Sequence, residues 1–470
     1  MAVIDAIARK AVRLSYTDLG EDVIEAVRQR VFDTLGATLV GLATPEGRVL
    51  TRLHERMTPS DAPCPATEAA RLLVGATRST EIDDIDVASC ATVGSVVVPS
   101  ALAVAASLPG TGERQLAAAV IAGYDAMIRL ARAIDGARVL YDGVWPSYVT
   151  APFAAAAVTA KLRDMDEAQT ARALALALAR SALLWSARHG GSAFRFHALG
   201  CAAAEGIGAA LAAHAGVDVS ANVLNAYAAA IGTDLDEAVV LEDLADWRVL
   251  DVDTKLFPTS RQALASAEAL QRMLPLPGSI DDIEQIVVHV PSAYRDMVDR
   301  PALPSGRIES MIGVQYQLAL AAIEPTQLYD VLRESLPSDA RFAQLVSRIQ
   351  VRADPSLTER FPLSWGSRVD IRWRSGEESN AEVHDPHGSR LRRLDWQALR
   401  GKLDRILSAS GPATNELVAG GRTEELMSRC RSIGDGAGGN AAHDLLQLAQ
   451  SICGRNRPIA RVAVSARCKH

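Results

Sequence analysis

The chain has 470 residues, of which 49% are hydrophobic and 4% are aromatic, and its formal net charge is −7. This length favours two domains rather than one core, and the apolar content excludes a disordered chain. The negative charge argues against nucleic acid as the main partner, so no nucleic-acid partner is expected.

Residues 1–270 are predicted to be almost wholly helical. In 20–41 the apolar side chains recur every three or four residues, which is the pattern of an amphipathic helix. The segments that follow are rich in alanine and apolar on more than one face, which is typical of helices buried among other helices. These segments cover residues 113–134, 148–162, 166–187 and 197–215.

The character of the chain changes near residue 275, where the sequence Leu-Pro-Leu-Pro-Gly interrupts the helical pattern. Runs of apolar or alternating residues then predict β-strands. These strands cover residues 283–290, 347–352, 368–374 and 379–384. Helical character returns at about 395 and continues to about 451.

These patterns predict a mainly α fold with an inserted α+β domain. A large all-helical domain takes residues 1–270 and 396–470, and a smaller α+β lid domain takes residues 275–395. No apolar run reaches about 18 residues, so no membrane span or membrane partner is expected. The N-terminus lacks the regions of a signal peptide, and the six cysteines form no Cys-x-x-Cys pair. A cytoplasmic protein with reduced thiols is expected.

The general catalytic motifs that occur in the sequence predict no reaction. Residues 434–439 match Gly-x-Gly-x-x-Gly, but no strand precedes them, so we interpret them as a loop. His384 and His387 flank a turn, and a solvated turn is the preferred interpretation over a metal site. The sequence has no His-Glu-x-x-His or Gly-x-Ser-x-Gly motif.

Four segments have unusually many polar residues in apolar surroundings, namely 81–95, 143–148, 188–197 and 251–261. Structural explanations exist for them: the aspartates of the first and Ser147 of the second would cap helices, and Trp145 would belong to the core. The last segment contains Lys255, one of five lysines among 49 basic residues. Unlike arginine, a buried lysine can lose its proton and serve as an acid or base.

The order of six short segments resembles the MmgE/PrpD family, which includes 2-methylcitrate dehydratase, cis-aconitate decarboxylase and iminodisuccinate epimerase. The resemblance covers roughly residues 1–450. The matching segments are 27–41, similar to the family's N-terminal helix; 81–84, similar to an acidic F-D-D motif; 144–147, similar to W-H-P-T; 194–200, similar to K-x-x-H-A-G; 254–259, similar to K-x-Y/F-P; and 300–316, which ends in a tyrosine.

The resemblance implies a helical domain with an α+β lid, usually as a homodimer. It also implies an active site between the domains and a small-molecule substrate that bears carboxylates. Members of the family need no metal and no organic cofactor, so none is expected here.

The sequence departs from the family's pattern at its histidines. Thr92-Val-Gly-Ser95 stands where dehydratase- and decarboxylase-like members have a histidine, and the histidine of the W-H-P-T motif is replaced near Trp145. Arg195 takes the place of a lysine if Gly200 sets the register. Ser260 stands where a histidine can follow the K-x-Y/F-P motif.

The resemblance also implies roles for single residues. Lys255 would be the acid, base or charge-stabilising group, with a surface ion pair as the alternative, and Tyr316 would be its proton partner or a donor to the substrate. Asp83 and Asp84 would orient the site or act as a base. The substrate-binding candidates are Arg195 and Arg261, which would bind carboxylates, together with Trp145, Tyr148, Ser260 and His197, for which packing is an equal alternative.

The leading hypothesis is a cofactor-independent lyase or isomerase that moves protons at an activated carbon of a small di- or tricarboxylate. Because imidazole suits dehydration near neutral pH, the loss of histidines favours an iminodisuccinate-epimerase-type member. The alternatives are a hydro-lyase or carboxy-lyase like 2-methylcitrate dehydratase or cis-aconitate decarboxylase, and a pathway-specific or non-catalytic family member. Lys255→Met is expected to abolish turnover while thermal stability stays near that of the wild type.

Overall fold

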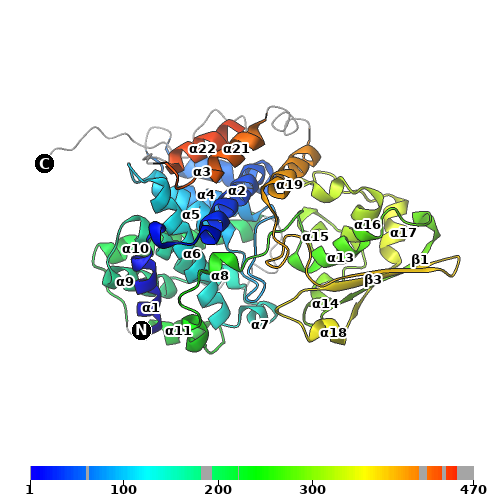
Figure 1. The fold of residues 1–470 in the computed structure, drawn as a ribbon, viewed down its shortest axis with the longest axis horizontal. Coiled ribbons are helices and arrows are strands. Elements are labelled where there is room, and N and C mark those ends of the chain that lie inside the picture. The colour runs from blue at the N-terminus through cyan, green and yellow to red at the C-terminus, as the bar shows by residue number, and fades with distance from the viewer. Residues whose placement is uncertain are drawn as a thin grey trace. The chain divides into compact units, whose positions relative to one another are not determined.

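The structure, a computed structural model, describes residues 2–59, 63–181, 193–220, 222–411, 421–436 and 441–452. Its contacts divide the chain into two units. The first consists of Met1–Ser79, Ser89–Asp251 and Ala419–His470, and the second of Thr80–Ala88 and Val252–Val418. Helices make up the first unit, whereas the second combines helices with a sheet (Figure 1). The predicted fold class, a helical part with a smaller α+β part, is therefore confirmed.

The limits of the units differ from those expected at 270, 275 and 395. Residues 80–88 belong to the second unit, where Ile85 exchanges backbone hydrogen bonds with Asp253. Two helices expected in the helical domain, α13 (Arg261–Arg272) and α19 (Trp396–Ala409), also belong to it. Helical periodicity reveals a buried face but does not reveal which core that face packs against. Residues 412–420, 437–440 and 453–470 lie outside the described residues.

The first unit is built around two alanine-rich helices, α8 and α10. α8 packs against α5, α6, α9 and α10, and α10 also packs against α4. The elements of this unit are α1 (Ala2–Arg13), η1 (Tyr16–Asp18), α2 (Glu21–Ala43), α3 (Pro45–Met57), α4 (Ala66–Arg78), α5 (Gly94–Ala106), α6 (Glu113–Ala133), α7 (Gly136–Tyr141), α8 (Pro146–Leu162), α9 (Glu167–Ala179), α10 (Ala193–His214), α11 (Val223–Ala230), α12 (Glu237–Leu241), η3 (Arg248–Leu250), α21 (Arg422–Arg431) and α22 (Ala441–Ile452).

The helices predicted in the N-terminal half are confirmed. The apolar stripe of 20–41 forms α2, and the alanine-rich segments form α6, α8, α9 and α10. α9 ends at Ala179, and residues 182–187 of the predicted segment lie outside the described residues. α10 is long and apolar enough to cross a membrane by length and composition, but 61% of its most apolar stretch is buried in the first unit. Packing as a core helix explains this composition.

Gly200 allows α10 to approach α4 closely. A Cβ atom at this position would lie 2.2 Å from the carbonyl oxygen of Arg71, which is a backbone atom of α4. Gly200→Ala is therefore expected to lower the free energy of unfolding by about 1–3 kcal/mol, as overpacked cores do. Urea denaturation of the purified variant measures this change.

Gly208, on the same helix, provides a matched control. A Cβ atom there would find the flexible end of Arg180 at 3.4 Å, with no closer atom. Gly208→Ala should be neutral or stabilise the protein by about 0.5–1 kcal/mol, because alanine is the better helix former. Equal changes in the free energy of unfolding of the two variants would contradict the explanation that Gly200 is needed for the close approach of α10 and α4.

The glycine-rich segment that begins at residue 434 holds a carboxylate of the same chain. The backbone N–H groups of Gly434 and Gly436 donate to Oε2 of Glu113 at 2.9 and 3.3 Å, and Arg429 contacts the other carboxylate oxygen. Gly434 has a φ of 91°, a conformation that favours glycine. Up to residue 436 the segment is a loop, as expected, and residues 437–440 lie outside the described residues.

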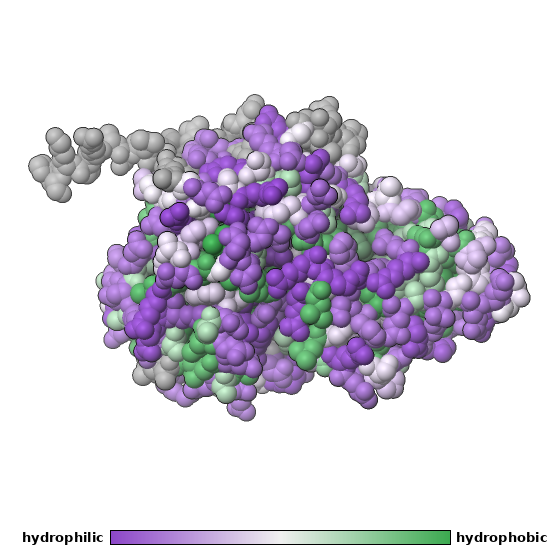
Figure 2. Space-filling model, viewed as in Figure 1, coloured by the Kyte–Doolittle hydropathy of each residue, from purple (hydrophilic) through white to green (hydrophobic). Residues whose placement is uncertain are grey.

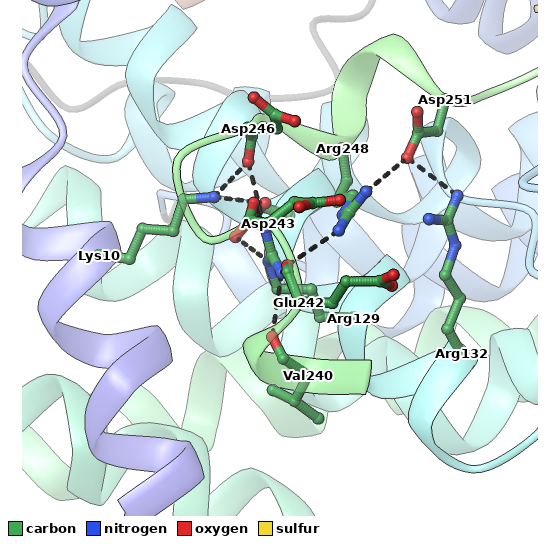
Figure 3. A network of polar contacts seen from close by, with 10 residues as sticks. Lys10, Arg129, Arg132, Val240, Glu242, Asp243, Asp246, Arg248 and Asp251 are labelled. Atoms are coloured by element: carbon green, nitrogen blue, oxygen red, sulfur yellow. Dashed lines mark hydrogen bonds and ion pairs between the residues drawn. The ribbon is translucent and has the colours of Figure 1, made fainter. Parts of the chain in front are cut away.

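A buried cationic network holds residues 240–251 against α1 and α6 (Figure 3). On α6, Arg129 donates to the carboxylate of Asp125 at 3.0 Å, and Lys10 on α1 donates to the same carboxylate at 2.9 Å. The guanidinium of Arg129 also donates to the backbone carbonyl oxygens of Val240, Glu242, Asp243 and Asp246. Buried carbonyl groups need donors, and this arginine supplies them to the end of α12 and to the residues that follow it.

The second unit contains a sheet, which includes β1 and β3 (Figure 1). Its four strands have the order β2-β1-β3-β4. β1 runs parallel to β2 and antiparallel to β3, and β3 runs antiparallel to β4. The other elements of this unit are helical. The bounds are η4 (Ile280–Asp282), β1 (Ile283–Val290), α14 (Ser292–Val298), α15 (Arg307–Ser310), α16 (Val314–Ile323), η5 (Gln327–Tyr329), α17 (Ala340–Ser347), β2 (Ile349–Ala353), α18 (Pro355–Thr358), β3 (Ser367–Trp373) and β4 (Glu378–Val383), in addition to α13 and α19.

The register of the sheet explains why apolar and polar residues alternate along its strands. Val288 on β1 pairs with Val351 and Val369 on its two neighbours, which gives a buried apolar row across three strands. The next residue, His289, points to the opposite face. α13 packs against β3 and β4. All four predicted strands are confirmed: β1 has the predicted ends, and the ends of the other three differ by one or two residues.

The exposed apolar side chains are dispersed. Figure 2 shows one face of the molecule, on which the described residues are mostly hydrophilic and the apolar ones form small separate patches. The most exposed large apolar residues include Met57, Leu363 and Leu391. Scattered apolar side chains of this kind are normal on protein surfaces.

Candidate functional site

The backbone of the second unit brings two distant segments side by side. Ile85 and Asp253 exchange N–H···O=C hydrogen bonds of 2.9 and 2.8 Å, which form an isolated antiparallel bridge. Continuing this register by two residues places Asp83 opposite Lys255. These two residues are 172 positions apart in the sequence.

Lys255 is a buried cation between two carboxylates. Its Nζ lies 3.2 Å from Oδ1 of Asp83 and 3.3 Å from Oε2 of Glu81, and only 1% of Lys255 is exposed. Both acidic residues are buried as well. Removing three charges from water is costly unless they pair, and these ion pairs offset that cost. A surface ion pair, the alternative explanation of Lys255, is therefore wrong.

Glu81 adopts a backbone conformation that is unfavourable for its residue type. Its φ is 55°, in the left-handed region, which costs a residue other than glycine roughly 1–2 kcal/mol. The carbonyl oxygen of Glu81 accepts a hydrogen bond of 3.3 Å from the N–H group of Thr259. Such strain persists where surrounding contacts impose it, and it is common at functional sites.

None of the aspartates of the acidic segment is the N-cap residue of the next helix. The next helix, α5, begins at Gly94, and its N-cap residue is Val93, which makes no side-chain cap. Asp83 instead accepts a hydrogen bond from Lys255, and Asp84 is buried in the same segment. The capping interpretation is wrong, whereas the orienting or basic role of these residues stays a prediction.

Arg261 binds a carboxylate of the protein itself. Its Nε and Nη2 atoms donate to Oδ2 of Asp253 at 2.9 and 2.7 Å, and the N–H group of Arg390 donates to Oδ1 at 2.7 Å. This ion pair is buried, so it favours a structural role over the predicted binding of a substrate carboxylate. Ser260 is the N-cap residue of α13, and its hydroxyl group donates to the carbonyl oxygen of Ile312 at 3.4 Å.

Tyr316 has neighbours other than Lys255. Its hydroxyl group donates to the carbonyl oxygen of Pro337 at 3.0 Å, and its ring packs near Phe342 on α17. Burial raises the pKa of Tyr316 to about 12. A tyrosine with such a pKa releases its proton reluctantly near neutral pH. Glu81 and Asp83 contact Lys255 directly, so they are favoured over Tyr316 as its partners.

In the first unit, the polar segment 143–148 contacts residues of two others, Arg195 and Thr92. The guanidinium of Arg195, on α10, lies 4.4 Å from the ring centroid of Trp145, and its backbone carbonyl accepts a hydrogen bond of 2.7 Å from the hydroxyl of Tyr148. Ser147 lies between Trp145 and Tyr148 in the sequence. Its Oγ atom is 2.9 Å from the N–H group of Thr92 and 3.0 Å from the hydroxyl of the same residue. The N-cap residue of α8 is Trp145, so the interpretation of Ser147 as a cap is wrong.

His197 lies in a different group from Arg195. Together with His54 and Arg71 it lines a small pocket formed by α3, α4 and α10, and its Nε2 atom is 3.4 Å from Sγ of Cys201. Burial and the nearby charge of Arg71 lower the pKa of His197. These contacts favour the packing alternative for His197. Residues 188–192 of the predicted segment lie outside the described residues.

Glu81, Thr92 and Ser147 are not among the site residues that the sequence predicts. The signals were present, because Glu81 belongs to the acidic run and Thr92 replaces the family's histidine. Long-range pairing was needed to reveal their neighbours. Within the described ranges, no group of three or more histidine, cysteine, aspartate or glutamate side chains is arranged to hold a metal ion.

Comparison with known protein families identifies both parts of the chain. Residues 5–231 match the MmgE/PrpD N-terminal domain, and residues 257–420 match the MmgE/PrpD C-terminal domain. The chain belongs to the MmgE/PrpD family. No individual curated protein matches it.

Membership of the MmgE/PrpD family confirms the resemblance that the short motifs suggested. It supports an enzyme of the lyase or dehydratase type. In this MmgE/PrpD chain, the acidic motif and the K-x-Y/F-P motif meet within the second unit, through Asp83 and Lys255. The W-H-P-T-like and K-x-x-H-A-G-like motifs meet within the first, through Trp145 and Arg195.

Proposed function

We propose that this MmgE/PrpD protein is a cofactor-independent lyase or isomerase that performs acid–base chemistry on a small di- or tricarboxylate. The observation that supports this proposal is the buried Lys255, whose ammonium group is bonded to Glu81 and Asp83. Within the family, we propose a function nearest to that of an iminodisuccinate-epimerase-type member.

The Lys255 cluster has the parts that proton transfer at carbon requires. Asp83 or Glu81 would accept the proton from a carbon next to a carboxylate, and the Lys255 ammonium would stabilise the negative charge that develops. In an epimerisation, one C–H bond breaks, the proton passes to the base, and a proton returns to the other face of the carbon. Reactant and product then have the same atoms, and no oxidant is needed.

Arg195 remains our proposed binding residue for a substrate carboxylate. A guanidinium can donate two parallel hydrogen bonds to a carboxylate. Stacking on the ring of Trp145, at 4.4 Å, would fix the orientation of the guanidinium plane of Arg195. The hydroxyl of the buried Ser95 has no hydrogen-bond partner among the described residues and would serve as a further donor. Tyr148 would act through the backbone of Arg195, to which it donates.

Dehydration or decarboxylation is the second candidate, and it follows from the family type. The hydroxyls of Thr92 and Ser147, bonded to each other, stand in segments where such members have histidines. Hydroxyl groups donate hydrogen bonds but do not titrate near neutral pH, which favours the isomerase.

We also propose a cytoplasmic homodimer. The family resemblance supports the dimer, and the free thiols of Cys64, Cys201 and Cys430 fit a reducing compartment. Cys453 and Cys468 lie outside the described residues. Light scattering of the purified protein measures its mass in solution, and a monomer would reject the dimer.

Proton exchange in heavy water tests the proposed reaction. The protein is incubated in D2O with a panel of small di- and tricarboxylates, and NMR follows their carbon-bound protons. We expect exchange without net conversion of at least one substrate. Alkene absorbance or CO2 release with 2-methylcitrate or cis-aconitate would favour the second candidate, and no exchange across the panel would favour a non-catalytic member.

A further inference from the structure

A second buried lysine contacts the acidic segment that holds Lys255. Lys402, on α19, is 1% exposed, and its Nζ donates to the carbonyl oxygen of Ile82 at 2.9 Å. Ile82 lies between Glu81 and Asp83, the two residues whose carboxylates bond Lys255. Two of the five lysines of the chain therefore converge on residues 81–83 of the second unit.

We propose that Lys402 is a positioning residue, which fixes the backbone of residues 81–83 so that both carboxylates face Lys255. This role rests on the proposed function of the Lys255 cluster. Lys402 acts through Ile82 and is not itself assigned to the chemistry.

The local geometry explains why this segment needs an anchor. Residues 80–88 are a short piece of chain separated in sequence from the rest of the second unit, and they form no helix. The left-handed conformation of Glu81 is unfavourable and needs contacts that impose it. The Ile85–Asp253 bridge holds one side of Asp83, and Lys402 holds the carbonyl group on the other side.

A charged donor suits this position better than a neutral one. Hydrogen bonds from charged donors are about twice as strong as neutral ones, and the lysine stem can pass through apolar surroundings to reach the carbonyl group. The two bonds to Lys255, at 3.2 and 3.3 Å, are at the long end of the usual range. A small displacement of residues 81–83 would therefore break them.

Lysine NMR tests the positioning role without any substrate. Protein labelled with ¹³C and ¹⁵N in lysine gives few signals, since the chain has five lysines. Each signal is assigned by substitution. In Lys402→Met we expect the Lys255 signal to shift and broaden. An unchanged Lys255 signal in folded Lys402→Met would overturn the proposal.

Kinetics provides the second measurement. For Lys402→Met we expect kcat to fall by about 10- to 100-fold with a smaller change in KM, because misplacement of reacting groups acts mainly on the chemical step. Lys402→Arg, which keeps a charged donor, should restore much of kcat. If Lys402→Met does not fold, Lys402→Gln is used instead. Its side chain is polar but too short to reach the carbonyl oxygen of Ile82, so the Lys255 signal should differ from that of the wild type.

Lys161 provides a matched control. It also donates to two backbone carbonyl groups, of Val12 and Leu14, but it belongs to the first unit. Lys161→Met should leave both the Lys255 signal and kcat unchanged. If the wild type exchanges no protons with any substrate, the proposed function fails, and the NMR signal alone still decides whether Lys402 positions the segment.

Discussion

Lys255→Met is expected to abolish proton exchange and to lower the free energy of unfolding by about 3–5 kcal/mol. The substitution leaves the carboxylates of Glu81 and Asp83 buried without the ammonium group that lies 3.3 and 3.2 Å from them. The sequence predicted unchanged stability, because it could not show that Lys255 is buried. Urea denaturation and exchange in D2O measure the two effects.

A compensated variant separates chemistry from stability. In Lys255→Met combined with Glu81→Gln and Asp83→Asn, all three charges are removed, so most of the lost stability should return. Activity should remain absent, since both the proposed base and the charge-stabilising group are gone. Exchange at the wild-type rate in folded Lys255→Met would reject the catalytic role, and full stability of the single variant would contradict the buried ion pairs.

Arg129→Met should strongly destabilise the first unit, with an expected loss in the free energy of unfolding of about 3–5 kcal/mol. The Arg129 side chain is 0% exposed, and it joins Asp125 to four carbonyl groups of the segment 240–246 (Figure 3). Methionine fills similar space but supplies no donor, so Asp125 and the four carbonyl groups lose the hydrogen bonds that Arg129 donates. Chemical denaturation with circular dichroism measures the loss.

Arg138 provides the control for this prediction. It pairs with Asp135 and Asp142 on α7 and in its flanks, but 47% of its side chain is exposed. Arg138→Met should cost less than about 1 kcal/mol, as exposed ion pairs do. Arg129→Lys should recover part of the loss, since it keeps the charge. If Arg129→Met and Arg138→Met both lower the free energy of unfolding by less than about 1 kcal/mol, the buried network contributes little to stability.

The candidate site was only partly predictable. The rarity of lysine drew attention to Lys255, and the acidic run drew attention to Asp83, but their contact depends on a bridge between Ile85 and Asp253. Tyr316 was selected by its motif, yet the face it presents on α16 depends on packing near Phe342. Arg261 carries the positive charge that binding a substrate carboxylate requires, but it forms a buried ion pair with Asp253 of the same segment.

The sequence by itself determined the family, the helices and the strands, because these depend on short motifs and on periodicity along the chain. The alternation of side chains around Val288 and the alanine content of α8 are local properties, which can be read from residues that are neighbours in the sequence. Only the tertiary structure decided that Lys255 is buried between Glu81 and Asp83, and that residues 80–88 belong to the second unit. Burial and charge pairing arise between residues far apart in sequence, so no local pattern records them.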